Sequence, residues 1–392
     1  MSVDDDPLAA ALAAAGLGDV RPGETRPPEP TIEVVDPEPD EPVAPPELWP
    51  EGVGTGVGSM PGTDPTEASA VVTGETPDLP ALPELPARGV GADMIGRTAG
   101  LLVDIATEVV PTGWRVTARP GRDKRRAADL LAFDVDAFDE ACDRIGSAWV
   151  KVQAVGPWTL AASIELASGH RVLTDHGAVA EFAASLTEGL RAHVEEIAAR
   201  TGARVLVQLD EPSLPAVIAG ILPTASGYGT VRSVRGPDAA DRLREVIAGL
   251  GAPVVVHCCA DRPPIRLLAS TGAAAVGIDA TRPAFSGGTA IPAALDAIGE
   301  TWDAGIPMML GMLPSTAPAP EPEIGDLART GFELADRLGF GRERLARLAL
   351  PAPACGLAGA TPEWARRALG LSSELGTAFA DPDEVPPEAG DG

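Results

Sequence analysis

The stretch Val254-Val255-Val256-His257-Cys258-Cys259-Ala260 decides how this chain is interpreted. Its three valines form an apolar, β-branched run that predicts a buried strand, and the run ends in one imidazole and two thiols. Because alternate side chains of a strand face the same side, His257 and Cys259 are expected on one face and Cys258 on the other. Imidazole and thiolate are zinc ligands, but cysteine and histidine also occur as ordinary core residues. The rest of the sequence is needed to separate these two interpretations.

The composition predicts a soluble protein with a large core. The chain has 392 residues, of which 45% are hydrophobic, and a formal net charge of -27. Such a charge disfavours nucleic acid and anionic membrane surfaces as partners, since both require clusters of Lys and Arg. Only four cysteines are present, which is too few for a disulfide scaffold of this size. With acidic residues at the N-terminus and no apolar run of about 20 residues, we expect a cytoplasmic location and no membrane span.

Three regions differ in composition. Residues 1–52 are rich in Pro, Asp and Glu, which predicts a disordered acidic tail. Residues 378–392 have the same character and are predicted to form a second disordered tail. The folded domain is therefore expected to span residues 53–377.

Within this domain, short apolar runs alternate with segments of helical periodicity, a pattern typical of βα units and a parallel sheet. Eight such repeats predict an α/β fold of the (β/α)8 TIM-barrel type. A doubly wound open sheet is the alternative, but no dinucleotide-binding glycine motif follows the first strand. The eight predicted strands are Thr55–Pro61, Trp114–Arg119, Val150–Pro157, Val205–Pro212, Pro253–Cys259, Ala274–Asp279, Met308–Leu313 and Leu348–Cys355.

Polar residues stand at the ends of most of these predicted strands, where the loops of a barrel build its active face. Ionised carboxylates are rarely buried without a partner, so their recurrence at strand ends favours a functional site over core filling. A zinc ion is the partner that suits the residue types present. The predicted metal ligands are His257, Cys259 and Cys355, with Asp279 as the fourth ligand or a near neighbour.

Four motifs together resemble the catalytic barrel of cobalamin-independent methionine synthase, in the short single-barrel form seen in actinobacteria. The resemblance covers the chain from about Gly54 to Leu371. The motifs occur in the family's order and on the corresponding strands. They are Gly58-Ser59-Met60-Pro61, Gln208-Leu209-Asp210-Glu211-Pro212, His257-Cys258-Cys259 and Cys355-Gly356-Leu357.

The resemblance implies a zinc-dependent methyltransferase that methylates the thiol of homocysteine to give methionine. Ser59 and Asp210 would hold the amino-acid part of homocysteine, and the metal would bind its sulfur. Glu211 would act beside Asp210 on the ammonium group or anchor a loop. Further expected substrate contacts come from Gln153, Trp158 and, in the loop after the fourth strand, Tyr228.

The sequence also departs from the family. Larger members place a glutamate ligand on the sixth strand where this chain has Asp279, and they carry an aromatic residue for the folate ring that is missing after Gly156-Pro157-Trp158-Thr159. The methyl donor, a folate, methylcobalamin or another compound, therefore stays open. The alternatives are a related zinc-dependent thiol alkyltransferase with a different thiol or a corrinoid donor, a metal-free decarboxylase-like barrel, and a non-catalytic paralogue.

Overall fold

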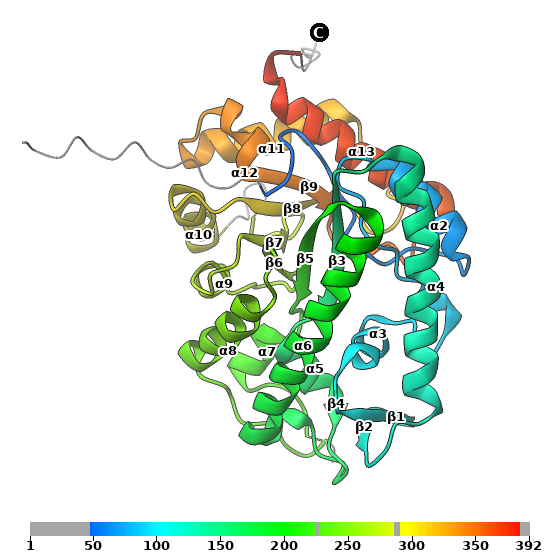
Figure 1. Ribbon diagram of the computed structural model, residues 1–392. Coiled ribbons are helices and arrows are strands. Elements are labelled where there is room, and N and C mark those ends of the chain that lie inside the picture. Colours follow the sequence, from blue (N-terminus) through cyan, green and yellow to red (C-terminus); the bar gives the residue numbers. More distant parts are fainter. Residues whose placement is uncertain (1–47, 225–226, 286–290, 385–392) are drawn as a thin grey trace, which may run out of the picture. The chain divides into compact units, whose positions relative to one another are not determined.

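A six-stranded parallel sheet forms the centre of the domain (Figure 1). The computed structural model describes residues 48–224, 227–285 and 291–384. The sheet is curled, and its order β3-β5-β6-β7-β8-β9 follows the chain, as in folds of the TIM-barrel type. Its strands are β3 (Trp149–Val155), β5 (Arg204–Asp210), β6 (Val254–Cys258), β7 (Ala275–Asp279), β8 (Met308–Leu313) and β9 (Ala349–Pro353).

Helices follow the strands and lie on the outside of the sheet (Figure 1). The sequence marks their ends: Asp175 accepts a hydrogen bond from Ala178 N at the start of the longest helix, and Gly202, with φ +67°, ends it. The helices are α2 (Pro65–Glu75), α3 (Met94–Leu101), α4 (Arg122–Ile145), α5 (Pro157–Ser163), α6 (His176–Thr201), α7 (Leu214–Ala219), α8 (Gly236–Gly249), α9 (Ile265–Ala269), α10 (Pro292–Asp303), α11 (Ile324–Leu338), α12 (Leu345–Leu348) and α13 (Pro362–Ala380), with short 3-10 turns at Pro86–Arg88, Val172–Thr174, Arg342–Arg344 and Pro382–Glu384.

Two extended segments, 53–60 and 79–85, connect β3 and β9, the outer strands of the sheet. Thr55 N donates to Pro351 O of β9 over 3.0 Å, and Lys151 N of β3 donates to Pro80 O over 2.8 Å. The segments also pair with each other through a parallel bridge between Ser59 and Glu84. The predicted first strand, Thr55–Pro61, is thus an extended segment with isolated bridges instead of a regular strand.

The predicted second strand, Trp114–Arg119, is wrong as a barrel strand. It corresponds to β2 (Gly113–Thr117), which pairs with β1 (Ala106–Val110) and β4 (Ile164–Glu165) in a separate three-stranded sheet. The position beside β3 is taken by the segment 79–85, which the sequence analysis did not identify. The other six predicted strands are confirmed.

The interior enclosed by the sheet has an apolar layer and a polar layer. The apolar layer includes Trp149, Leu206, Val255 and Met309, each near the start of its strand. Side chains of a strand alternate with a period of two, so every second residue lies on the same face. Further along the strands, the buried residues on the face of the apolar layer are polar. This polar layer consists of Glu84, Lys151, Gln153, Gln208, Asp210, His257 and Asp279.

The described domain extends beyond the predicted limits 53–377. Trp49 is buried and packs in the apolar layer of the interior, so residue 49 does not belong to a solvated tail. Helix α13 runs through residue 378 to Ala380, which places the predicted start of the second tail inside a helix. Residues 1–47 and 385–392 lie outside the described part of the chain. Among the described residues, no helix is both long and apolar enough to cross a membrane.

His193 on α6 is buried, and this burial is expected to make the domain sensitive to acid. Burial, together with the nearby Arg97 guanidinium, lowers the pKa of His193 to about 3. The unfolded state therefore binds one more proton than the folded state between about pH 6.5 and 3, so stability falls as the pH falls through this range. When chemical denaturation is measured at pH 6.5 and at pH 5, the free energy of unfolding should fall less between the two pH values in His193→Gln than in the parent. The difference between the two proteins should be about 1 to 2 kcal/mol. The exposed His176 provides the control: His176→Gln should behave like the parent, and equal acid sensitivity of His193→Gln contradicts the prediction.

Candidate active site

Two thiols meet at the carboxyl ends of β6 and β9. Cys259 follows β6, Cys355 follows β9, and their sulfur atoms lie 3.5 Å apart in a shared hydrogen bond. This contact, together with the neighbouring His257 imidazole, lowers the pKa of Cys355, while the same contact and burial raise the pKa of Cys259. Cys258 points the other way into the core, where burial raises its pKa to about 12, and Cys142 is buried in α4. The structure thus separates a reactive thiol pair from two packing residues.

His257 stands beside Asp210 because β5 and β6 pair these two positions. The imidazole Nδ1 lies 2.7 Å from Asp210 Oδ1, and the Gln208 amide donates to the same oxygen over 2.8 Å. Gly277 on β7 leaves room for the ring, since a Cβ there would lie 3.0 Å from His257 Cδ2. A carboxylate on one ring nitrogen fixes the orientation of the other, which is the arrangement found at many histidine metal ligands.

The side chain of Asp279 binds groups of its own loop. Its Oδ1 accepts hydrogen bonds from Thr281 N and Thr281 Oγ1, and its Oδ2 lies 2.7 Å from Arg282 Nε. Arg282 also reaches Asp261 and the carbonyl of Cys259. With both carboxylate oxygens engaged, the geometry does not support Asp279 as a metal ligand. It holds Arg282, which ties the loops after β6 and β7 together.

Replacing Asp279 by asparagine is therefore expected to leave metal affinity within about threefold of the parent, because its carboxylate is not among the proposed ligands; loss of a group that orients a ligand would cost about 10- to 100-fold. Asparagine keeps one acceptor oxygen, which can serve Thr281, and loses the acceptor for Arg282. The measurement is a zinc competition titration against a chromogenic chelator. Cys259→Ala serves as the comparison that should lose binding, and an equal loss in Asp279→Asn would restore Asp279 to the ligand set.

The thiol pair fits two positions of a zinc site, but the described residues do not complete one. Zn–S bonds of about 2.3 Å at a tetrahedral angle place two sulfurs about 3.8 Å apart, close to the observed 3.5 Å. Among the residues that the structure describes, no group of three or more His, Cys, Asp or Glu is arranged to hold a metal ion. The donor types suit zinc; a third ligand would have to move into place.

One wall of the site carries Ser59 and a carboxylate that the sequence analysis missed, Glu84. Ser59 lies against Gly356, where a Cβ would sit 2.0 Å from the serine hydroxyl, so the glycine permits this contact. Glu84 is paired to Ser59 through the backbone bridge. Burial raises the pKa of Glu84 to about 7, although Arg97 opposes the shift. Gln153 is buried next to this segment, donates to Leu82 O over 2.6 Å, and has no described partner for its Oε1.

Glu211 and Trp158 are structural in this geometry, which corrects their predicted roles. Both oxygens of Glu211 are used at the start of α5, by Trp158 N and by the backbone and hydroxyl of Thr159. Gly156 allows this approach, since a Cβ would lie 2.4 Å from Glu211 Oε1. Trp158 is buried and donates its indole N–H to Ala239 O. Glu211 therefore anchors the α5 loop, the second of the two roles considered for it, and Trp158 packs in the core.

Tyr228 lies away from the site. It is 99% exposed in the loop between α7 and α8, so it makes no buried contact with the thiols or with Asp210. Its contact with substrate stays a prediction. The loop includes residues 225–226, which lie outside the described part of the chain.

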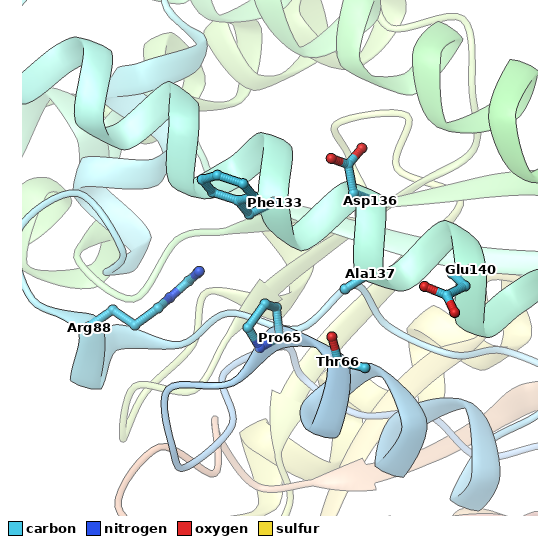
Figure 2. A pocket seen from close by; sticks show the side chains of 7 residues that line it. All are labelled: Pro65, Thr66, Arg88, Phe133, Asp136, Ala137 and Glu140. Carbon is cyan, nitrogen blue, oxygen red and sulfur yellow. The ribbon is translucent and has the colours of Figure 1, made fainter.

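A separate hollow lies between α2 and α4 on the outside of the domain (Figure 2). It has a volume of about 360 Å³, and Figure 2 shows Arg88 and Phe133 near one end and Asp136 and Glu140 on α4. None of the predicted site residues lines it.

A parallel α/β fold of the TIM-barrel type with paired thiols and buried carboxylates at its strand ends defines an enzyme-like site. The family model "Cobalamin-independent synthase, Catalytic domain" matches residues 53–377. The chain belongs to this family, which assigns it methyltransferase chemistry of the methionine-synthase type. The resemblance identified from the four motifs is thus confirmed.

A solved structure supports the fold. A B12-independent methionine synthase from Shewanella sp. W3-18-1, in complex with selenomethionine, is 13% identical, with a TM-score of 0.52 over 84% of this chain and 97% of that one. A methyltransferase from Methanosarcina mazei is 15% identical, with a TM-score of 0.42 over 85% of this chain and 93% of that one. A comparison with curated protein sequences finds no match.

Proposed function

We propose that this chain transfers a methyl group to the sulfur of homocysteine and releases methionine. The observation that carries the proposal is the close association of the thiol pair with Ser59, which lies against the residue following Cys355. An amino acid with a thiol side chain needs a sulfur-binding group and an ammonium-binding carboxylate on one surface. Cys259 and Cys355 supply the sulfur-binding group, and Glu84 and Asp210 supply the carboxylates for the ammonium group.

The amino-acid end is proposed to bind between Asp210, Glu84 and Ser59. Asp210 Oδ1 is occupied by Gln208 and His257, whereas the contacts among described residues leave Oδ2 for a ligand. A buried carboxylate gains strongly from a charged hydrogen-bond donor such as an ammonium group. The Ser59 hydroxyl would donate to the substrate carboxylate. Gln153 Oε1, which lacks a described partner, is a further acceptor in this wall.

The sulfur end is proposed to bind at a zinc site formed by Cys259, Cys355 and His257. When bound, zinc keeps the substrate sulfur deprotonated and nucleophilic at neutral pH, where a free thiol with a pKa near 8.5 is only a few per cent ionised. Asp210 would hold the His257 ring so that its second nitrogen faces the thiols. The protein then orients the substrate sulfur toward the methyl group of a donor bound above it.

We also propose that segments 53–60 and 79–85 are the first two strands of a (β/α)8 barrel in irregular form. Their hydrogen bonds to β9, to each other and to β3 support this assignment. A cytoplasmic location is proposed with it, because a thiol site of this kind needs a reducing compartment.

The function is tested by turnover with homocysteine and a panel of methyl donors. The panel contains methylfolates of different glutamate length and methylcobalamin, and zinc is measured in the same preparation. Methionine formation with at least one donor, lost after chelation and restored by zinc, is the expected result. A zinc-loaded protein that forms no methionine with any donor and is not stabilised by homocysteine would reject the proposal, since a ligand of the native state raises its apparent stability.

A further inference from the structure

Lys151 is a fully buried charge in the interior of the sheet. Its relative exposure is 0%, whereas lysine is almost never fully buried unless it is paired. Its Nζ donates to Gln208 Oε1 over 2.6 Å and to Val57 O over 3.2 Å. The burial of an ammonium group costs several kcal/mol unless nearby groups compensate it. The position therefore needs an explanation that packing alone does not give.

The compensating charges are the carboxylates of the proposed substrate site. Burial lowers the pKa of Lys151 to about 8, and Asp210 and Glu84 act against this shift. No described carboxylate lies within ion-pair distance of Lys151 Nζ, so the charge of Lys151 and that of Asp210 interact across an intervening group. That group is the Gln208 side chain, which lies between Lys151 and Asp210.

A continuous chain of hydrogen bonds runs from Lys151 to His257. Lys151 Nζ donates to Gln208 Oε1, Gln208 Nε2 donates to Asp210 Oδ1 over 2.8 Å, and Asp210 Oδ1 lies 2.7 Å from His257 Nδ1. Gln208 Nε2 also donates to Val57 O over 2.9 Å. All four side chains are buried.

Lys151 fixes the direction of the Gln208 amide together with two acceptors on the other side, Val57 O and Asp210 Oδ1. An ammonium group has donors only, so the amide oxygen must face it. The amide nitrogen then faces Asp210, where it can donate. With the amide reversed, its NH₂ would meet the ammonium and its oxygen would meet both Asp210 Oδ1 and Val57 O, leaving three buried contacts repulsive.

We propose that Lys151 is a positioning residue for substrate binding: through Gln208 it holds Asp210 with Oδ1 toward His257 and Oδ2 toward the substrate ammonium. This inference rests on the proposed function for the identity of the substrate. The chain of contacts from Lys151 to His257 does not depend on it. One residue thereby orients groups at both ends of the site, the ammonium-binding carboxylate and the imidazole beside the thiols.

The test compares Lys151→Met with Lys124→Met in the full chain. Lys124 is a matched control because its ammonium group likewise donates two hydrogen bonds, in this case to the backbone carbonyls of Leu102 and Ile105, but lies outside the site. The first readout is the ¹⁵N spectrum of the histidine side chains, of which the chain has four. The second is the homocysteine affinity by calorimetry, together with KM and kcat.

In Lys151→Met, the His257 signal should move while the other three histidines stay, and homocysteine affinity should fall about 10- to 100-fold, mainly through KM. Lys124→Met should match the parent in both readouts. If Lys151→Met does not fold, Gln208→Leu breaks the same chain one link further on and should give the same result. An unchanged His257 signal in the folded variant overturns the proposal. A shifted signal in a protein whose parent does not bind homocysteine rejects the proposed substrate and retains the positioning role.

Discussion

Replacing Cys355 by alanine is expected to remove bound zinc and to lower methionine formation by more than about 100-fold. Loss of a direct ligand should cost more than loss of a residue that only orients a ligand, which lowers metal affinity or activity about 10- to 100-fold. The Cys355 thiol has a lowered pKa and lies 3.5 Å from Cys259, so it is the group best prepared to bind a metal as thiolate. Its side chain is exposed, so alanine leaves no core cavity. Metal analysis and turnover are measured on one preparation, and circular dichroism checks the fold.

Cys258 provides the matched control for this experiment. It is adjacent to Cys259 in sequence but faces the core, and Cys258→Ala should keep zinc and activity while losing about 1 kcal/mol of stability or somewhat more for a small cavity. Zinc retained in Cys355→Ala at the parental level would mean that the thiol pair is not the metal site. Full activity in metal-depleted parent protein would exclude zinc from the reaction.

Replacing Asp210 by asparagine should lower kcat/KM for homocysteine by about 100-fold or more, because a charged hydrogen bond of about 1.5 to 3 kcal/mol is lost and one amide donor now meets other donors. Gln208 Nε2 and His257 Nδ1 both contact Asp210 Oδ1, so an amide NH₂ at this position faces either them or the substrate ammonium. Steady-state kinetics and homocysteine-induced thermal stabilisation measure the effect.

The control for Asp210 is Asp261, whose side chain is 82% exposed and pairs with Arg282 in the loop after β6. Asp261→Asn removes one carboxylate from the same end of the domain and should change kcat/KM by less than about threefold, because exposed ion pairs contribute at most about 1 kcal/mol. Homocysteine affinity equal to the parent's in Asp210→Asn would show that the amino group binds elsewhere.

Six strands were predictable because they are mostly buried and largely apolar, with the clearest run at Val254 to Val256. The segments 53–60 and 79–85 lack this signal. Gly54 is required by the close approach of α13, since a Cβ there would lie 2.1 Å from Ser372 O. Pro80 and Pro83 interrupt the second segment and read as a loop. The aromatic and β-branched run around Trp114 was correctly read as a strand, but such a run does not specify which sheet it joins.

The thiols and Asp210 were identifiable because they follow clear strands in recognisable motifs. Glu84 was missed since it is flanked by proline-containing sequence, and its burial depends on the bridge to Ser59. A signal for Lys151 was present: one charge inside the run from Trp149 to Val155 is unusual for a strand buried on both faces. For Asp279, the residue type fits a ligand, but its partner Arg282 three positions later decides its role.

Closure of the domain has a consequence for the order in which it folds. The first segment bonds to β9 and packs against α13, and Ser373 Oγ donates to Glu75 O across 298 positions of the chain. During synthesis, the earliest part of the domain therefore emerges long before its partners exist. Contacts of such sequence separation form slowly, and incomplete chains expose strand edges. A growing chain that has not reached α13 can build the middle of the sheet but cannot finish it, so the edges of the sheet stay open until the last elements have been made.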